Sequence, residues 1–429
     1  MSHELMQELS TWLEQWATET IFPGRLRLFC DERVAHVLSA PQRAIANWQG
    51  ATDGCLFGAA CGAAFMEAQR HGHVVVLLPA RALQDEQVRS AAILAVRLAL
   101  KKMTLIIVGT DVSDSDWLIE AGWSRSGDGL VVCHLLPPTV SFAVAPARLR
   151  EEQQPVHLSS LLPGDLPAWP VDDLSVPLAS IADWFSWIAL REPHVVVADL
   201  ATPWRNVAPS AVLLAALAQL ASEGRRVCWR VPTGTSLFPW LAIMHDIGRR
   251  GHGIKLIVAA RDLPNRPQLA ALTGWWVLVP NDVGEAAAML AFTLACDDPV
   301  LLALPAAMPV PLPTWIAGQA YLPGSGRWLC HGPQATIICD YRTLIAATQA
   351  ATELSREGIH AGVLICSTLI PLPIGDLDHI PPAPIIACGN DLGVAWSSAM
   401  IDRDLSISTV DDGMNAQAIS ELVKAKRRR

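Results

Sequence analysis

The stretch HVVVLLPARALQDEQVRSAAILAVRLALKK (residues 73–102) decides the fold class. It begins with a continuous apolar run, VVVLL, which is typical of a strand buried on both faces of a parallel sheet. A short turn, PARAL, leads into a segment with the apolar spacing of an amphipathic helix, which we expect over residues 86–102. Strand, turn and helix in this order form the unit on which α/β proteins usually hold a phosphate group. This turn, however, has proline and arginine where glycine would let the backbone approach a ligand.

The same alternation of strand-like and helical segments continues almost from end to end. It is typical of parallel sheets covered by helices. Two proline-rich stretches, residues 155–177 and 305–315, interrupt the pattern and separate three blocks. We therefore predict an α/β protein of three parallel-sheet domains. The predicted boundaries are 1–150 for the first domain, 151–178 for a linker, 179–310 for the second domain and 311–429 for the third.

Within these blocks the strands are short apolar runs and the helices are longer. The stretch LIPLP (residues 369–373) contains two prolines, and we expect it to form a turn. The predicted strands are 74–78, 104–109, 194–200, 226–231, 254–260, 275–280, 299–304, 335–341, 359–367 and 383–389, and the predicted helices are 54–72, 86–102, 210–223, 239–250, 283–295 and 342–358.

The composition is that of a packed globular protein, with 51% apolar and 17% charged residues. A formal net charge of −9 argues against a nucleic-acid-binding body, which would normally have a basic face. The cysteines are scattered singly without a C-x-x-C pair, so we predict buried free thiols in a reducing compartment. The N-terminus carries acidic residues, unlike a signal peptide, and no run of 18 apolar residues occurs. We therefore expect a cytoplasmic protein without a membrane span.

Other polar clusters have simple interpretations. The pairs His71 with His73 and His245 with His252 lack a third ligand at a recognised spacing, so we predict no metal site. The acidic stretch at residues 111–116 lacks the glycine and the closing glutamate of a calcium-binding loop. The basic run KAKRRR at the C-terminus could contact RNA or an acidic partner, but a solvated tail is the simpler interpretation.

Two later stretches resemble the transketolase family, which includes the 1-deoxy-xylulose-5-phosphate synthases. VPNDVGEAAAMLAFTLACDDPVLLALP (residues 279–305) is similar to the end of that family's pyrimidine-binding domain, where a P-x-D-x-x-E turn starts a helix. QATIICDYRTLIAATQAATELSREGIHAGVLICSTLIPLP (residues 334–373) is similar to its C-terminal domain. The resemblance implies the thiamine-diphosphate-binding architecture, with a diphosphate-binding domain, a pyrimidine-binding domain and a C-terminal domain in this order.

The resemblance also implies a set of cofactor ligands. Family members hold thiamine diphosphate and magnesium across a subunit interface, and a Gly-Asp-Gly turn supplies a carboxylate to the metal. The turn PARAL stands in this place, so Pro79, Ala80 and Arg81 replace the three residues. In the family, an asparagine after the next strand supplies another oxygen ligand to the metal. Asp111 stands in its place here. Because magnesium requires several oxygen ligands in near-octahedral geometry, one remaining acid would make a poor site.

The pyrimidine side of the implied site is altered as well. A family glutamate early on a helix activates the aminopyrimidine of the cofactor, and the corresponding residue here is Ser210. We interpret Ser210 as the N-cap of an apolar helix. An aromatic ring normally stacks on the pyrimidine within a segment that ends in His-Asp. Thr235 falls in the place of this ring, whereas His245 and Asp246 are retained.

These replacements favour a catalytically degenerate transketolase-like protein that binds neither thiamine diphosphate nor magnesium and acts as a structural or regulatory interaction subunit. We expect a homodimer, or a hetero-oligomer with another protein. The alternative is an active thiamine-diphosphate-dependent carbon–carbon transferase with relocated cofactor ligands, for which Asp111, His245 and Asp246 are the residues to test. A third hypothesis is an enzyme that reuses the cleft for other chemistry.

Overall fold

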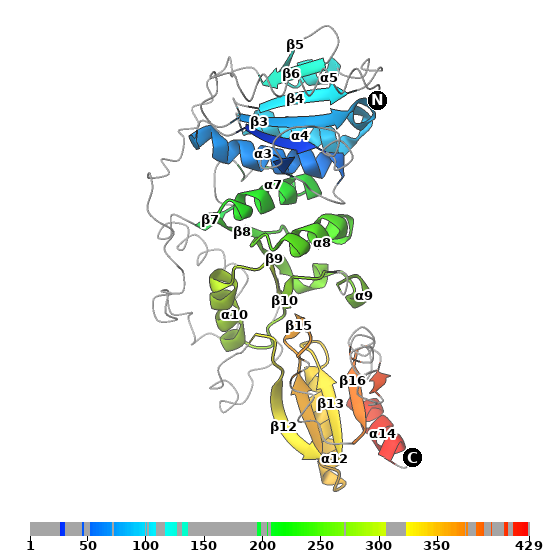
Figure 1. Cartoon of the computed structure of the whole chain (residues 1–429). Coiled ribbons are helices and arrows are strands. Elements are labelled where there is room, and N and C mark those ends of the chain that lie inside the picture. Colours follow the sequence, from blue (N-terminus) through cyan, green and yellow to red (C-terminus); the bar gives the residue numbers. More distant parts are fainter. Residues whose placement is uncertain are drawn as a thin grey trace. The chain divides into compact units, whose positions relative to one another are not determined.

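The computed structural model describes the chain in segments that form two compact units (Figure 1). The first unit comprises Met1–Pro155, Ala189–Trp229 and Pro239–Ile254, and the second comprises Val156–Ile188, Arg230–Phe238 and Lys255–Arg429. The predicted linker at 151–178 lies outside the described residues. The described residues are 26–30, 45–46, 52–70, 73–98, 100, 103–108, 116–126, 131–135, 195–198, 204, 207–269, 272–305, 323–373, 375, 383–389, 396, 407–410 and 415–427.

A six-stranded sheet, ordered β2-β1-β3-β4-β6-β5, lies in the first unit. The apolar run of the opening stretch forms β3 at its centre, where six of seven residues are buried. β3 pairs in parallel with β1 and β4, as predicted, whereas β6 pairs antiparallel with β4 and β5. The prediction of a parallel sheet is therefore correct for the centre of this sheet and wrong for one edge. The strands are β1 Leu26–Cys30, β2 Ile45–Ala46, β3 His73–Pro79, β4 Met103–Val108, β5 Trp123–Ser126 and β6 Val131–Leu135.

Helices α3 (Asp53–Arg70) and α4 (Glu86–Arg97) accompany this sheet. α4 ends five residues before the predicted end at 102, because the chain must reach the start of β4 at Met103. Its outer face is polar, and its inner face is apolar and buried. The 3-10 helix η2 (Ala80–Gln84) connects β3 to α4, and the short helix α5 (Asp116–Glu120) precedes β5.

Helix α3 packs closely against helix α7 (Ala211–Ser222) within the first unit. Gly58 faces the backbone of Val212, and Gly62 faces the backbone of Ala216. A methyl group added at Gly62 would lie 2.2 Å from the Ala216 carbonyl oxygen, so only glycine permits this approach. The first unit also contains β7 (Val195–Val197), which pairs in parallel with β8 (Arg226–Arg230), and helix α8 (Leu241–Arg250), which follows the 3-10 helix η6 (Phe238–Trp240). Arg230 and Phe238 are the residues of β8 and η6 that belong to the second unit.

In the second unit the strands β15, β10, β11 and β9 are neighbours in this order. β11 pairs in parallel with β9 and β10, but β15 pairs antiparallel with β10. β15 contains Leu369 and Ile370, so the prediction of a turn over LIPLP was wrong for these two residues. They complete the edge of a sheet whose other strands lie far away in the sequence, and no local pattern reveals this pairing. The elements are β9 Lys255–Ala259, η7 Ala260–Asp262, α9 Arg266–Leu269, β10 Trp276–Leu278, α10 Val283–Ala295, β11 Val300–Leu304 and β15 Thr368–Ile370.

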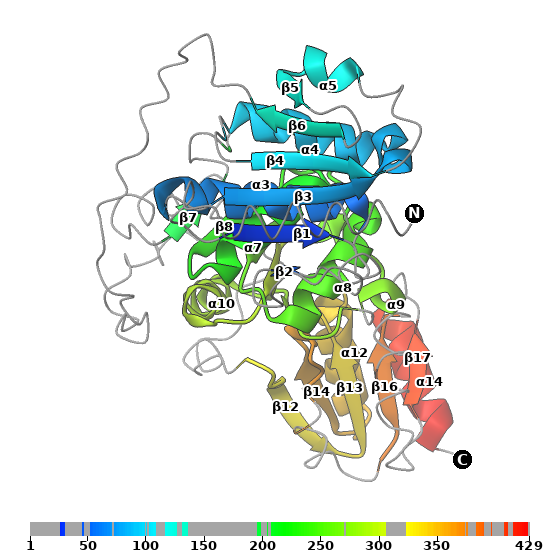
Figure 2. The same ribbon diagram turned by 45° about the horizontal axis from the view of Figure 1, so that its top comes forward.

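A further sheet of the second unit has the order β12-β14-β13-β16-β17, with β12 antiparallel to β14 and the other pairs parallel (Figure 2). Apolar side chains of its strands form one core with helices α12 and α14. The elements are β12 Arg327–Pro333, β13 Ala335–Cys339, α12 Leu344–Arg356, β14 Ala361–Ile365, β16 Ile385–Cys388, β17 Ile407–Val410 and α14 Ala416–Arg427.

The basic C-terminal run is helical as far as Arg427, and its described residues are exposed or half-buried. α14 buries Ile419 and Val423 against the core, and this anchors the basic residues that follow on the same helix. Lys424 forms ion pairs with Glu357 of α12 and with Glu421.

The described cysteines are free thiols, as predicted. Most are buried, but Cys330 is exposed and Cys296 is half-buried, so the prediction of uniform burial was wrong for these two. In the part of the chain that the structure describes, no helix is both long enough and apolar enough to cross a membrane.

Candidate functional site

The turn after β3 is the first place where the resemblance implies a cofactor ligand. Pro79 ends the strand with extended backbone angles (φ −69°, ψ 147°), and Ala80 and Arg81 open η2. Arg81 is exposed, and the turn offers neither a glycine nor an oxygen-bearing side chain. The nearest carboxylate in sequence, Asp85, accepts a hydrogen bond from the Gln87 backbone N–H at 2.8 Å. Asp85 therefore acts as the N-cap of α4.

A polar cluster next to this turn was not predicted. Thr52 donates its hydroxyl hydrogen to Gln87 Oε1 at 2.6 Å, and the Cys55 thiol contacts the same oxygen at 3.8 Å. Gly54 permits this contact between α3 and α4, because a methyl group there would lie 2.3 Å from Gln87 Cβ. Burial raises the pKa of the Cys55 thiol to about 11, so this sulfur is protonated and a weak nucleophile at neutral pH.

Ser210 is the N-cap of α7, as the sequence indicated. Its side chain accepts a hydrogen bond from the Leu213 backbone N–H at 3.2 Å, and its backbone is extended (φ −158°, ψ 162°). The helix that follows is buried over almost its whole length. Ser210 thus has a structural role that needs no cofactor.

We expect Ser210→Ala to lower the free energy of unfolding by about 1 kcal/mol, because one N–H at the start of α7 loses its acceptor. Ser222→Ala at the other end of the helix is the matched control. The Ser222 hydroxyl donates to the Gln219 carbonyl oxygen within the same helix, so its loss should change little. Urea unfolding of both variants would measure the effect, and equal stability of the two variants would contradict the capping role.

Thr235 lies in the loop between β8 and η6 and is half-buried. Asp262 holds this loop by accepting a hydrogen bond from the Gly234 N–H at 2.7 Å. The nearest aromatic side chain on the loop, Phe238, is 62% exposed. An aromatic residue is therefore present three positions beyond Thr235, at the start of η6.

His245 and Asp246 lie in α8 but have different surroundings. His245 is exposed, whereas Asp246 is buried and accepts a hydrogen bond from Arg250 Nε at 2.9 Å, one turn along the helix. Its second oxygen, Oδ1, is buried without a hydrogen-bond partner. Burial raises the pKa of Asp246, and the adjacent Arg250 opposes this shift. Asp111, the third residue to test, lies outside the described residues.

Two further histidines named in the sequence analysis, His73 and His252, are described by the structure. His73 is buried in β3, where its Nε2 contacts the Thr104 hydroxyl at 2.9 Å, and burial lowers the pKa of His252 to about 4. His71 lies outside the described residues. No group of three or more potential metal ligands occurs among the residues that the structure describes.

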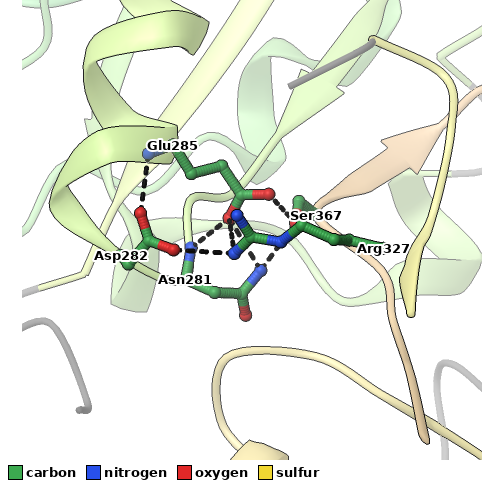
Figure 3. A network of polar contacts seen from close by, with 5 residues as sticks. All are labelled: Asn281, Asp282, Glu285, Arg327 and Ser367. Atoms are coloured by element: carbon green, nitrogen blue, oxygen red, sulfur yellow. Dashed lines mark hydrogen bonds and ion pairs between the residues drawn. The ribbon is translucent and has the colours of Figure 1, made fainter. Parts of the chain in front are cut away.

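A buried polar network lies at the start of α10, and the sequence had indicated only its P-x-D-x-x-E turn (Figure 3). Asp282 is the N-cap of α10, and its Oδ1 accepts the Glu285 N–H at 2.7 Å. Glu285 Oε2 in turn accepts the Asn281 backbone N–H at 2.7 Å. This arrangement resembles a capping box, except that Glu285 accepts from the N–H of the residue before the N-cap.

Two residues from distant segments complete this network. Arg327 of β12 donates to Asp282 Oδ2 at 2.7 Å and lies 3.8 Å from Glu285 Oε2. Ser367, between β14 and β15, donates to Glu285 Oε1 and accepts from Asn281 Nδ2 at 2.6 Å. Sequence reasoning missed Arg327 and Ser367, because nothing near them in the sequence indicates these partners.

Solved structures with a similar fold include several transketolases. They include the transketolase of Pichia stipitis in complex with sedoheptulose 7-phosphate (13% identity, TM-score 0.60, covering 88% of this chain and 80% of that chain). The transketolase of Leishmania mexicana (14%, TM-score 0.58, 88% and 80%) and that of Campylobacter jejuni (12%, TM-score 0.58, 89% and 82%) are similar to the same extent. This chain therefore has a transketolase-like α/β fold, as the sequence resemblance implied. It matches no family model and no curated protein. At such low identity the likeness establishes the fold and not the activity.

Proposed function

We propose that this chain is a catalytically degenerate transketolase-like protein that binds neither thiamine diphosphate nor magnesium and works as a structural or regulatory interaction subunit. The observation that carries this proposal is the turn after β3. A methyl group at Ala80 stands where the resemblance implies a metal-binding carboxylate. Asp85, the next acid along the chain, is occupied as a helix N-cap. This turn does not fit magnesium, which requires oxygen ligands.

The pyrimidine side supports the same proposal. Ser210, in the place of the activating glutamate, cannot exchange a proton at neutral pH as a buried carboxylate can, and its oxygen already caps α7. Thr235 has no ring to stack on a heterocycle. Three replacements on separate segments are harder to reconcile with retained thiamine chemistry than a single one.

The contact between α3 and α7 adds a further argument. Helix α3, which precedes the altered turn, packs against α7, the helix that begins at Ser210, within this chain. The metal side and the pyrimidine side of the implied site are both altered in this sequence. A protein of this kind would act through its outer surfaces rather than by completing the site of an intact partner.

Calorimetric titration of the purified protein with thiamine diphosphate and magnesium tests the proposal. We expect no saturable heat up to about 1 mM cofactor, which corresponds to a binding free energy weaker than about −4 kcal/mol. The mass in solution of the same preparation should exceed the 46.2 kDa of one chain, and its cooperative melting would confirm that the sample is folded. Micromolar binding of thiamine diphosphate would refute the proposal that cofactor binding is lost. A protein that is strictly monomeric in solution would contradict only the proposed self-association.

A second candidate function rests on Asp246. A buried carboxylate with a raised pKa and one unpartnered oxygen is a frequent feature of catalytic sites. Such a carboxylate would suit an active thiamine-diphosphate-dependent transferase with relocated cofactor ligands. It would equally suit an enzyme that uses the cleft implied by the resemblance for other chemistry. The variant Asp246→Asn distinguishes the two functions. If the wild type binds thiamine diphosphate in the calorimetric titration and Asp246 is a relocated ligand, this variant should no longer bind it.

A further inference from the structure

The network of Figure 3 joins three segments that are far apart in the sequence. Asp282 and Glu285 belong to the start of α10, Arg327 to β12, and Ser367 to the link between β14 and β15. The Ser367 carbonyl oxygen also accepts the Val279 N–H at 2.8 Å, directly beside the antiparallel pairing of β15 with β10. We call Asn281, Asp282, Glu285, Arg327 and Ser367 together the α10 latch, because they fasten the segment around β15 to the sheet that contains β10.

The charges of the α10 latch balance only if one carboxyl group is neutral. All of its side chains are buried, and its two carboxyl groups face one guanidinium group. Arg327 pairs directly with Asp282 at 2.7 Å, while Glu285 lies further away at 3.8 Å. Two ionised carboxylates against one cation would leave a net negative charge buried, which is costly in a medium of low dielectric constant.

The hydrogen bonds of Glu285 identify where a proton would reside. Its Oε2 faces only donors, namely the backbone N–H and the Nδ2–H of Asn281 and the guanidinium of Arg327. Its Oε1 faces the Ser367 hydroxyl, which can either donate to a carboxylate or accept from a carboxylic acid. Ser367 can accept from Glu285 and from Asn281 together, because a hydroxyl oxygen has two lone pairs. The network can thus take up a proton at Oε1 while Ser367 and Glu285 stay in contact, because the direction of their hydrogen bond reverses and the Ser367 hydroxyl hydrogen turns away from Glu285.

We propose that the α10 latch is proton-dependent: it holds the β15 segment firmly when Glu285 is protonated and loosens when Glu285 is ionised. The charged groups that act on Glu285 are Arg327 and Asp282, and the polar neutral groups are Asn281 and Ser367. Burial raises the pKa of Glu285, an effect that Arg327 and the hydrogen bond from Ser367 oppose. The stabilisation by the protonated acid is therefore complete below the ordinary pKa of 4.5 and is lost as the pH rises through the raised value.

Hydrogen exchange of the Val279 amide measures the latch directly, because this N–H donates to the Ser367 carbonyl oxygen. Between about pH 5 and about pH 9, we expect its protection in the wild type, corrected for the intrinsic rate, to fall by about tenfold or more. In Glu285→Gln, which imitates the protonated acid, protection should stay constant over this range.

Two further variants make the experiment decisive. Asp282→Asn keeps an N-cap but leaves Glu285 as the only carboxylate for Arg327, so the loss of protection at high pH should disappear. Glu421→Gln removes a surface carboxylate whose side chain is 65% exposed and should behave like the wild type. Constant protection in the wild type would overturn the proposal, as would a pH dependence in Glu285→Gln equal to that of the wild type.

Discussion

Gly62→Ala is expected to destabilise the protein by about 3 kcal/mol or more, although alanine favours an isolated helix over glycine by about 1 kcal/mol. The new methyl group would lie 2.2 Å from the carbonyl oxygen of Ala216, well inside van der Waals contact. Because this obstacle is backbone, neither helix can relieve it by turning a side chain. The helices α3 and α7 would have to separate and expose apolar surface that is now buried. Urea unfolding of the purified variant measures the loss.

The controls distinguish this clash from a general effect of the substitution. At Gly375 an added methyl group meets nothing within 4 Å, so Gly375→Ala should leave the stability nearly unchanged. Adding Ala216→Gly to Gly62→Ala should not restore stability, because it leaves the carbonyl oxygen in place. Wild-type stability of Gly62→Ala would mean that α3 and α7 do not pack in this way.

Arg327→Met is expected to lower the free energy of unfolding by about 3–5 kcal/mol, the usual cost of leaving a buried charge without its partner. Methionine retains the apolar part of the side chain, so the loss comes from the charge and its hydrogen bond to Asp282 at 2.7 Å. Burial of both partners makes this pair different from an exposed ion pair. Denaturant unfolding at neutral pH provides the measurement.

Asp282→Asn in the Arg327→Met background should recover a large part of the lost stability, because it removes the uncompensated carboxylate while keeping the N-cap. Lys424→Met, at an exposed ion pair with Glu357, should change stability little by comparison. A loss of less than about 1 kcal/mol for Arg327→Met would place this pair among weak surface interactions and would contradict its role in the α10 latch.

Features that depend on neighbouring residues were predictable from the sequence. The run VVVLL predicted the buried strand β3, and the amphipathic spacing predicted α4 up to its end. Ser210 was identified as an N-cap because a capping serine bonds to an N–H only three residues away. The resemblance of residues 279–305 and 334–373 to the transketolase family predicted the fold that the solved structures share.

The candidate site was predictable only in part. The sequence identified the turn at Pro79, Ala80 and Arg81, and the structure places an exposed arginine and a 3-10 helix there. It could not distinguish His245 from Asp246, whose different burial depends on which face of α8 the rest of the fold covers. The cluster of Thr52, Cys55 and Gln87 was missed, because its members come from the starts of two helices.

The alternation of strands and helices, the N-cap at Ser210 and the altered turn can be predicted from local sequence, since they depend on residues a few positions apart. Three features follow from the folded arrangement alone: Gly62 touches the backbone of α7, β15 joins a sheet as its antiparallel edge, and Arg327 pairs with Asp282. In each case the partners are tens of residues or more apart in the chain. Their pairing follows from apolar burial and from the need of buried polar groups for partners, which act only once the chain is folded.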